Sequence, residues 1–119
     1  MIKRLKNKTT SLAQTSDVPL QSEVQTSSVT SYGYSAGTKG RVNSFFGSYA
    51  GYSNTTGGGN SFVGSYAGYA NTTGAYNTAN GYSSLSANTT GINNTANGYQ
   101  SLSSNTTGSN NTSANVPSW

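Results

Sequence analysis

The residues of this sequence that could do chemistry are few, and they gather near its beginning. The acidic side chains are Asp17 and Glu23 alone, and the chain has no His and no Cys. General acid–base catalysis needs titrating groups, and nucleophilic catalysis needs a base beside the nucleophile. The many Ser and Tyr hydroxyls between Val42 and Trp119 have neither, because this stretch carries no charged residue. We therefore expect no enzymatic activity and no cofactor.

Metal and phosphate binding are equally poorly supported by the sequence. Calcium-binding repeats place Asp at fixed positions, whereas the repeated positions of this chain hold Asn or Ser. The glycines Gly57–Gly59 are followed by no Lys, so they indicate a turn and not a phosphate loop. We expect no bound metal.

The beginning of the chain is basic and polar, and it is the candidate anchor to a partner. The candidate anchoring residues are Lys3, Arg4, Lys6, Lys8, Val18 and Leu20. An acidic protein surface is the expected partner, while a solvated terminus is the plain alternative and nucleic acid is not expected. No apolar run suits a signal peptide or a membrane span, so we expect no membrane association.

A period of 17 residues governs the rest of the sequence. One column of Asn recurs at this spacing, as do two columns of Gly and a further column of Asn-Thr-Thr. The first column consists of Asn43, Asn60, Asn77, Asn94 and Asn111. Flexible linkers need no constant spacing, whereas a solenoid does, because each coil must return the chain to its neighbour.

The period predicts an all-β fold, a parallel β-solenoid (β-roll or β-helix) with 17-residue coils. Such a coil is too short for a helical-hairpin repeat, and Gly, Asn, Thr and Tyr dominate it. We expect two or three short strands per coil joined by Gly and Asn turns. The predicted domains are an extended N-terminal arm over 1–39 and a solenoid of four to five repeats with a C-terminal cap over 40–119.

Compensation between two columns identifies the predicted core. Where one column has Phe the other has Gly, and where it has Ala the other has Leu, so the volume of each coil stays similar. The facing columns are Phe45, Phe62, Ala79 and Ala96, and Gly51, Gly68, Leu85 and Leu102. Trp119 falls in the register of Leu102, and Pro117 precedes it, so we expect a terminal cap there.

The neighbouring columns are predicted to face outward. Adjacent strand residues point to opposite sides, so Phe46 and Val63 should leave the coil and require cover from another subunit. Tyr suits a wet or intersubunit surface because it combines apolar area with a polar tip. The predicted interface or surface residues are Phe46, Val63, Tyr49, Tyr66, Tyr82 and Tyr99. A stack of four or five coils, roughly 20–24 Å long, would be marginal alone, which favours a homotrimer.

The repeat Asn-Thr-Ala-x-Gly-Tyr-x-x-Leu-x-x-Asn-Thr-Thr-Gly-x-Asn resembles the repeats of trimeric β-roll and β-helix surface proteins. These include trimeric autotransporter adhesin heads and the fibre and decoration proteins of phages. The resemblance covers about residues 40–116, and Asn80 and Asn97 stand where the family has an aliphatic residue. Thr15–Leu20 resembles the anchoring stretch of some phage virion proteins.

The resemblance implies a virion structural protein at the virion surface, a short trimeric fibre or capsid decoration protein. Its N-terminal arm would bind a capsid, neck or tail protein. The alternative is an extracellular or cell-surface adhesin that binds a host-surface glycan through its Tyr columns. An ice-binding solenoid and a self-assembling filament subunit are further alternatives, suggested by the Thr ladders and by end-to-end stacking of coils.

Overall fold

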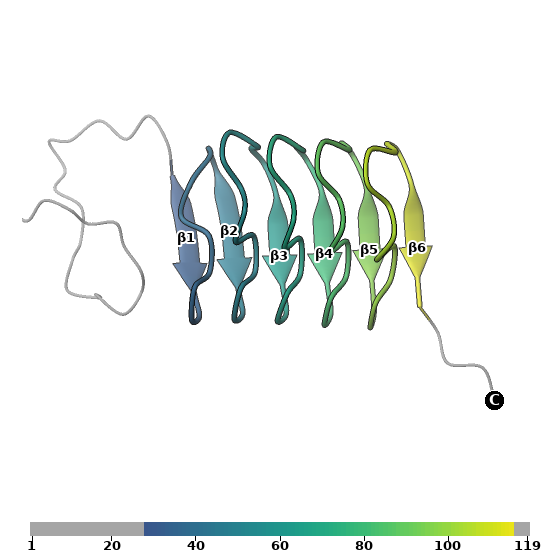
Figure 1. Ribbon diagram of the computed structural model, residues 1–119, viewed down its shortest axis with the longest axis horizontal. Helices are drawn as coiled ribbons and strands as arrows, with labels where there is room; N and C mark the ends of the chain where they lie inside the picture. The colour runs from purple at the N-terminus through teal and green to yellow at the C-terminus, as the bar shows by residue number, and fades with distance from the viewer. Residues whose placement is uncertain (1–27, 116–119) are drawn as a thin grey trace, which may run out of the picture.

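The computed structural model describes residues 28–115, which form a single stack of coils (Figure 1). The stack contains one sheet of six parallel strands, and each strand pairs with the next one in sequence. The strands are β1 (Val29–Tyr32), β2 (Asn43–Phe46), β3 (Ser61–Val63), β4 (Thr78–Asn80), β5 (Thr95–Asn97) and β6 (Thr112–Ala114). This arrangement confirms the predicted all-β parallel solenoid.

Each coil contains one regular strand, fewer than the two or three we expected. The remainder of the coil is a succession of turns, whose backbone groups still bond from coil to coil. Thr55, Thr56 and Gly57, for example, all donate their N–H groups to the carbonyl of Thr72, at 3.0–3.2 Å. The tight corners bend the chain too sharply for a second strand, yet they keep the hydrogen bonding of a stacked sheet.

The first coil is shorter than the others and begins before the predicted boundary at residue 40. Val29 of β1 pairs with Asn43 of β2, a separation of 14 residues, whereas Ser44 pairs with Ser61 at the expected 17. The later strand pairs keep the separation of 17. The solenoid thus starts at β1, because a three-residue deletion hides the first coil from a search for the period.

The apolar core is a narrow column between the strands and the turns that face them. Phe45, Phe62, Ala79, Leu85 and Ala96 are fully buried, and Leu102 is partly buried against them. The rings of Phe45 and Phe62 stack with their centroids 5.3 Å apart. Trp119, the predicted cap of this column, and Pro117 lie outside the described residues.

The predicted exchange of Phe–Gly for Ala–Leu is visible as direct contact across the coil. A Cβ atom placed on Gly51 would lie 2.8 Å from the ring of Phe45, and one on Gly68 would lie 2.3 Å from the ring of Phe62. The backbone is left-handed at this position in both kinds of coil, with φ of 62° at Gly51 and 52° at Leu85. Gly adopts this conformation freely, whereas for Leu it costs roughly 1–2 kcal/mol.

Two ladders of buried asparagines fill the side of the coil opposite the apolar column. The corner ladder consists of Asn54, Asn71, Asn88 and Asn105. After the first, each side-chain amide bonds to the side-chain amide of the equivalent Asn in the coil before it. The Nδ2 of Asn71 donates to the Oδ1 of Asn54 at 2.7 Å and to the carbonyl of Gly74 at 3.0 Å. Asn88 repeats the pattern, with its Nδ2 2.8 Å from the Oδ1 of Asn71.

The strand ladder (Asn43, Asn60, Asn77, Asn94 and Asn111) ties each strand start to the next coil. The Oδ1 of Asn60 accepts the backbone N–H of Asn77 at 2.9 Å, and its Nδ2 donates to the carbonyl of Gly74 at 2.9 Å. Gly74 therefore accepts one amide from each ladder. All these asparagines from Asn43 to Asn94 are almost completely buried, so each amide meets in the protein the hydrogen bonds that it loses in water.

The core exchange predicts strong energetic coupling between residues 79 and 85. Ala79→Phe alone should clash with Leu85, and Leu85→Gly alone should leave a cavity that costs about 2–5 kcal/mol of unfolding free energy. The double variant reproduces the Phe–Gly coil and should regain most of the loss, with a coupling of about 3 kcal/mol in denaturant unfolding. Pairing Ala79→Phe with Leu102→Gly, in another coil, is the control. Additive costs for residues 79 and 85 would contradict the packing described.

The corner ladder predicts a pH-dependent cost for Asn71→Asp. The new carboxylate would face two acceptors, the Oδ1 of Asn54 and the carbonyl of Gly74, and should destabilise the fold by about 3–5 kcal/mol at neutral pH. Burial and these acceptors should raise the pKa of the new carboxyl, so unfolding free energy should recover as acidification protonates it. Thr73→Asp, at an exposed position of the same corner, is the matched control and should cost little. Equal losses for both variants would contradict the ladder.

Candidate interaction surface

The outward side chains at the ends of the strands form a column that changes from apolar to polar along the stack. Tyr32, Phe46, Val63, Asn80 and Asn97 lie directly beside one another in the registers of the paired strands. The exposed fractions of Tyr32, Phe46 and Val63 are 56%, 37% and 42%. Phe46 and Val63 thus point outward as predicted, and the structure adds Tyr32 to them. We call these three residues the apolar strand face.

A second surface is made of tyrosines on the turns that follow the strands. The rings of Tyr49 and Tyr66 stack at 5.1 Å, and those of Tyr52 and Tyr69 stack at 5.4 Å. Edge contacts join these two stacks to each other and to Tyr34 and Tyr82. Tyr82 in turn stacks on Tyr99 at 5.5 Å. We call these seven residues the tyrosine cluster.

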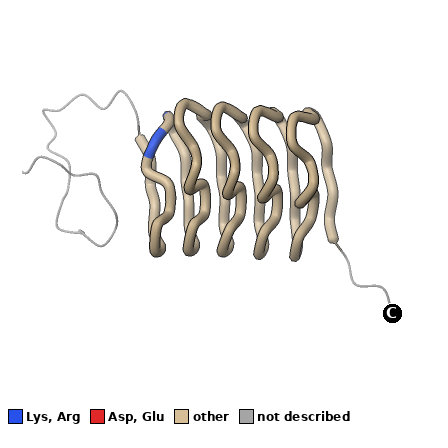
Figure 2. The backbone as a smooth tube through the Cα atoms, in the orientation of Figure 1, with Lys and Arg blue, Asp and Glu red and all other residues tan. Residues whose placement is uncertain are grey.

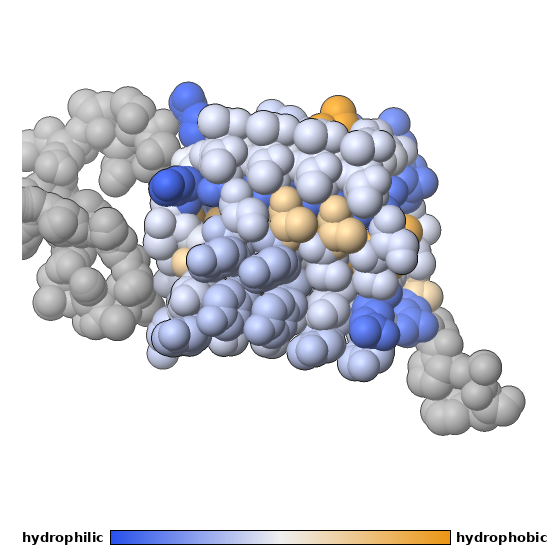
Figure 3. Space-filling model, viewed as in Figure 1, coloured by the Kyte–Doolittle hydropathy of each residue, from blue (hydrophilic) through white to orange (hydrophobic). Residues whose placement is uncertain are grey.

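In the stacked pairs of the cluster, each ring covers one face of its partner. The stacked pairs are nearly parallel, with interplanar angles of 7–14°, so neighbouring rings cover one another. Figure 3 shows a mostly pale, weakly polar surface over the coils, with deep-blue areas toward both ends and small separate orange areas. The predicted surface residues Tyr49, Tyr66, Tyr82 and Tyr99 all belong to this one cluster.

Tyr49 occupies the most crowded place in the cluster. Its ring touches those of four other tyrosines, and its backbone is left-handed, with φ of 62°. Partial burial, followed by repulsion from the phenols of Tyr34 and Tyr66, raises the pKa of Tyr49 above its ordinary value. The neutral phenol is therefore the form that the fold favours.

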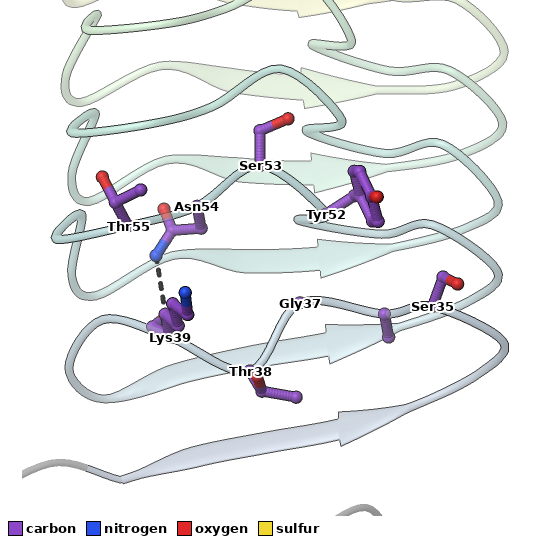
Figure 4. A pocket seen from close by; sticks show the side chains of 9 residues that line it. Ser35, Gly37, Thr38, Lys39, Tyr52, Ser53, Asn54 and Thr55 are labelled. Carbon is purple, nitrogen blue, oxygen red and sulfur yellow. Dashed lines mark hydrogen bonds between the residues drawn. The ribbon is translucent and has the colours of Figure 1, made fainter.

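The charges of the described residues lie together on the first coil. They are Lys39 and Arg41, and blue appears on the described part of the tube in Figure 2 only near its beginning. A pocket of about 250 Å³ lies beside Lys39, between the segments 35–39 and 52–55 (Figure 4). Asn54 donates its Nδ2 to the carbonyl of Lys39 across this pocket, at 2.8 Å.

The described residues contain no group of three or more His, Cys, Asp or Glu that could hold a metal ion. Over the same residues, no helix is long and apolar enough to span a membrane. The candidate anchoring residues Lys3, Arg4, Lys6, Lys8, Val18 and Leu20 lie outside the part of the chain that the structure describes.

Sequence reasoning missed the buried asparagine ladders and the first members of both surfaces. From the sequence, the asparagines indicate only the 17-residue period and the positions of the turns. The Asn columns do not vary from coil to coil, whereas the core columns exchange Phe for Ala. This constancy is the signal in the sequence that the Asn side chains make specific buried hydrogen bonds. Tyr32 and Tyr34 were missed because the short first coil moves them out of the 17-residue register.

No family model, no curated protein and no solved structure matches the chain.

The tyrosine cluster predicts that stability is constant from mildly acidic to mildly alkaline pH and falls beyond it. Residues 28–115 contain no Asp, Glu, His or Cys. Because the folded pKa of Tyr49 is raised, its contribution is complete below the unfolded value of 10.0 and is lost as pH rises through the folded value. Melting temperatures measured across this range should be level and then decline.

The matched variant for this measurement is Tyr49→Ser, because Ser83 already occupies the equivalent left-handed position. In this variant the melting temperature should decline less at alkaline pH, and it should still be independent of pH below that range. A decline that is the same in both proteins would contradict the assignment to Tyr49.

Proposed function

We propose that this protein is a structural component of a virus particle, a short trimeric fibre or capsid decoration protein. The observation that carries the proposal is the apolar strand face on a shaft whose described coils carry no charge from β2 onward. Monomeric proteins seldom leave aligned apolar side chains exposed without a binding role. A shaft that binds its own copies and performs no chemistry suits a building element of a particle.

A second copy of the chain is the partner that best fits the apolar strand face. The side chains of this face repeat once per coil, at the strand spacing of about 4.8 Å. A parallel copy presents the same spacing, so contacts made in one coil recur in the next. The described coils from β2 onward carry no charge, so copies placed side by side meet no electrostatic repulsion. Three copies around a common axis would cover each apolar strand face equally.

The predicted arm covers residues 1–39, of which residues 29–39 belong to the first coil. The part that precedes residue 29 is proposed to attach the assembly to the particle. Lys3, Arg4, Lys6 and Lys8 would bind an acidic surface of a capsid, neck or tail protein. Val18 and Leu20 would add apolar contacts. With the arm bound to the particle, the solenoid would project from it at the virion surface.

The adhesin alternative, in which a glycan stacks along the tyrosine columns, is less well supported by the geometry. Sugar rings stack on the open faces of aromatic rings, whereas each ring of the three stacked tyrosine pairs has one face covered by its partner, so the columns offer no continuous open face. The cluster is better suited to stiffening the turns and to contacting protein through its edges and hydroxyls.

The proposal predicts a homotrimer that depends on the apolar strand face. The purified chain should sediment as a trimer, and the double variant Phe46→Asn, Val63→Asn should sediment as a monomer. Asn80 and Asn97 already occupy this column, so the variant should keep the fold, which the far-ultraviolet circular dichroism spectrum checks.

Ile92→Ser is the matched control for this experiment. Ile92 has an exposed fraction of 40%, close to that of Val63, but it lies before its strand and not at the strand's end. This variant should remain trimeric. A wild-type chain that stays monomeric at all concentrations would overturn the proposal.

A further inference from the structure

The shortened first coil interrupts an otherwise regular repeat, and the interruption is confined to one corner. A Cβ atom on Gly37 would lie 2.0 Å from the carbonyl oxygen of Gly51, and one on Gly40 would lie 2.2 Å from that of Gly57. Both glycines of the first coil are thus in register with the second coil. Gly40 stands three positions after Gly37, but Gly57 stands six positions after Gly51, so the missing residues belong to the Asn-Thr-Thr corner.

The missing corner leaves the pocket that Figure 4 shows. Its rims are the segments 35–39 of the first coil and 52–55 of the second. Its volume of about 250 Å³ is somewhat below the range of drug-sized pockets, about 300–1,000 Å³, which suits a single sugar residue. We call it the first-coil pocket.

The pocket wall is held firmly at Lys39. The carbonyl of Lys39 accepts the Nδ2 of Asn54 at 2.8 Å and that of Asn43 at 3.1 Å. It replaces the amide oxygen that the corner ladder supplies in every later coil. Lys39 thereby ends the ladder, and its backbone is fixed beside the pocket while its side chain is exposed. Since residues 28–115 contain no carboxylate side chain, nothing described here neutralises it.

Tyr52 contributes an aromatic face to the same pocket. It is the first ring of the Tyr52–Tyr69 stack, and Tyr69 covers one of its sides. Within the described residues, no ring stacks on its other side, because Thr38 follows Gly37 where Tyr52 follows Gly51. Tyr52 therefore keeps one face, on the side of the first coil, that no described ring stacks on.

The hydrogen-bonding groups of the pocket suit a polyhydroxylated ligand. The carbonyl of Thr72 accepts three backbone N–H groups from the preceding corner, as described above, and also the Oγ1 hydroxyl of Thr55 at 3.1 Å. The carbonyl of Thr55 is equivalent to that of Thr72, one coil earlier. The corner that would donate to it is the one missing from the first coil, and no described residue donates to it instead. Ser35, Thr38 and Ser53 also line the pocket.

We infer that the first-coil pocket binds a carboxylated sugar residue, such as a uronic acid. The ammonium group of Lys39 pairs with the carboxylate, and the open face of Tyr52 packs against the sugar ring. The carbonyl of Thr55 and the surrounding hydroxyls take the sugar hydroxyls. This site is independent of the trimeric assembly proposed above, because it lies in a corner and not on the apolar strand face.

Titration of the full-length protein with glucuronic acid, followed by NMR, tests this inference. Glucuronic acid should bind, while glucose and acetate, which carry only the sugar or only the charge, should bind at least about fivefold more weakly. Acetate binding as well as glucuronic acid would overturn the sugar site, and so would an absence of binding.

Three variants locate the site. Lys39→Gln and Tyr52→Ser should each weaken glucuronic acid binding at least about fivefold, and Ser86 shows that Ser fits the position of Tyr52. Arg41→Gln, which removes the neighbouring charge outside the pocket, is the matched control and should bind normally. If Lys39→Gln binds normally, the basic residues near the N-terminus are responsible and the inference is wrong.

A repeat-completing variant separates binding from folding. Replacing Thr38–Gly40 by the sequence of Tyr52–Gly57 adds the missing corner and fills the pocket. Binding should be lost while the melting temperature is unchanged or higher. Undiminished binding by this folded variant would overturn the inference.

Discussion

Each coil depends on amide groups that find their partners in the coils beside it. The asparagines of both ladders are buried, and a buried amide without partners costs about 1–3 kcal/mol. The cost is avoided only when the carbonyl of Gly74, or its equivalent, stands at the right height to accept two amides at once. This requirement explains the constant spacing of 17 from β2 onward, because an extra residue between the ladder positions of a coil would displace the donors from the acceptor.

The apolar column is the more tolerant half of the coil. Its side chains change between Phe45 and Ala79 as long as the facing residue changes too, since dispersion and burial depend on filled volume and not on direction. Hydrogen bonds are directional, so the polar half allows no such exchange. The left-handed backbone at Leu85 shows that the polar half constrains the coil more strongly than the apolar half. The turn geometry that the Asn ladders require is kept, although it is unfavourable for Leu.

The fold class and the two faces of the strand could be predicted from the sequence, whereas three details could not. Period and alternation determine which side chains of β2 and β3 are buried, because neighbouring strand residues must point to opposite sides. The burial of the asparagines escaped prediction because Asn also favours exposed turns, and composition alone does not distinguish the two. The first coil escaped because its deletion breaks the register, and the left-handed Leu because propensity argues against it. The first-coil pocket depends on that deletion, so its residues could not be grouped from the spacing.

The pairing of Phe with Gly and of Ala with Leu also bears on how such a chain can grow over evolutionary time. A single substitution in either pair leads through a clash or a cavity, so one kind of coil is poorly placed to turn into the other by stepwise change. Copying a whole coil avoids that barrier, since the copy brings both partners and both amides with it. The two Phe–Gly coils stand together in the chain, followed by the two Ala–Leu coils, which is the order that duplication of entire coils would leave.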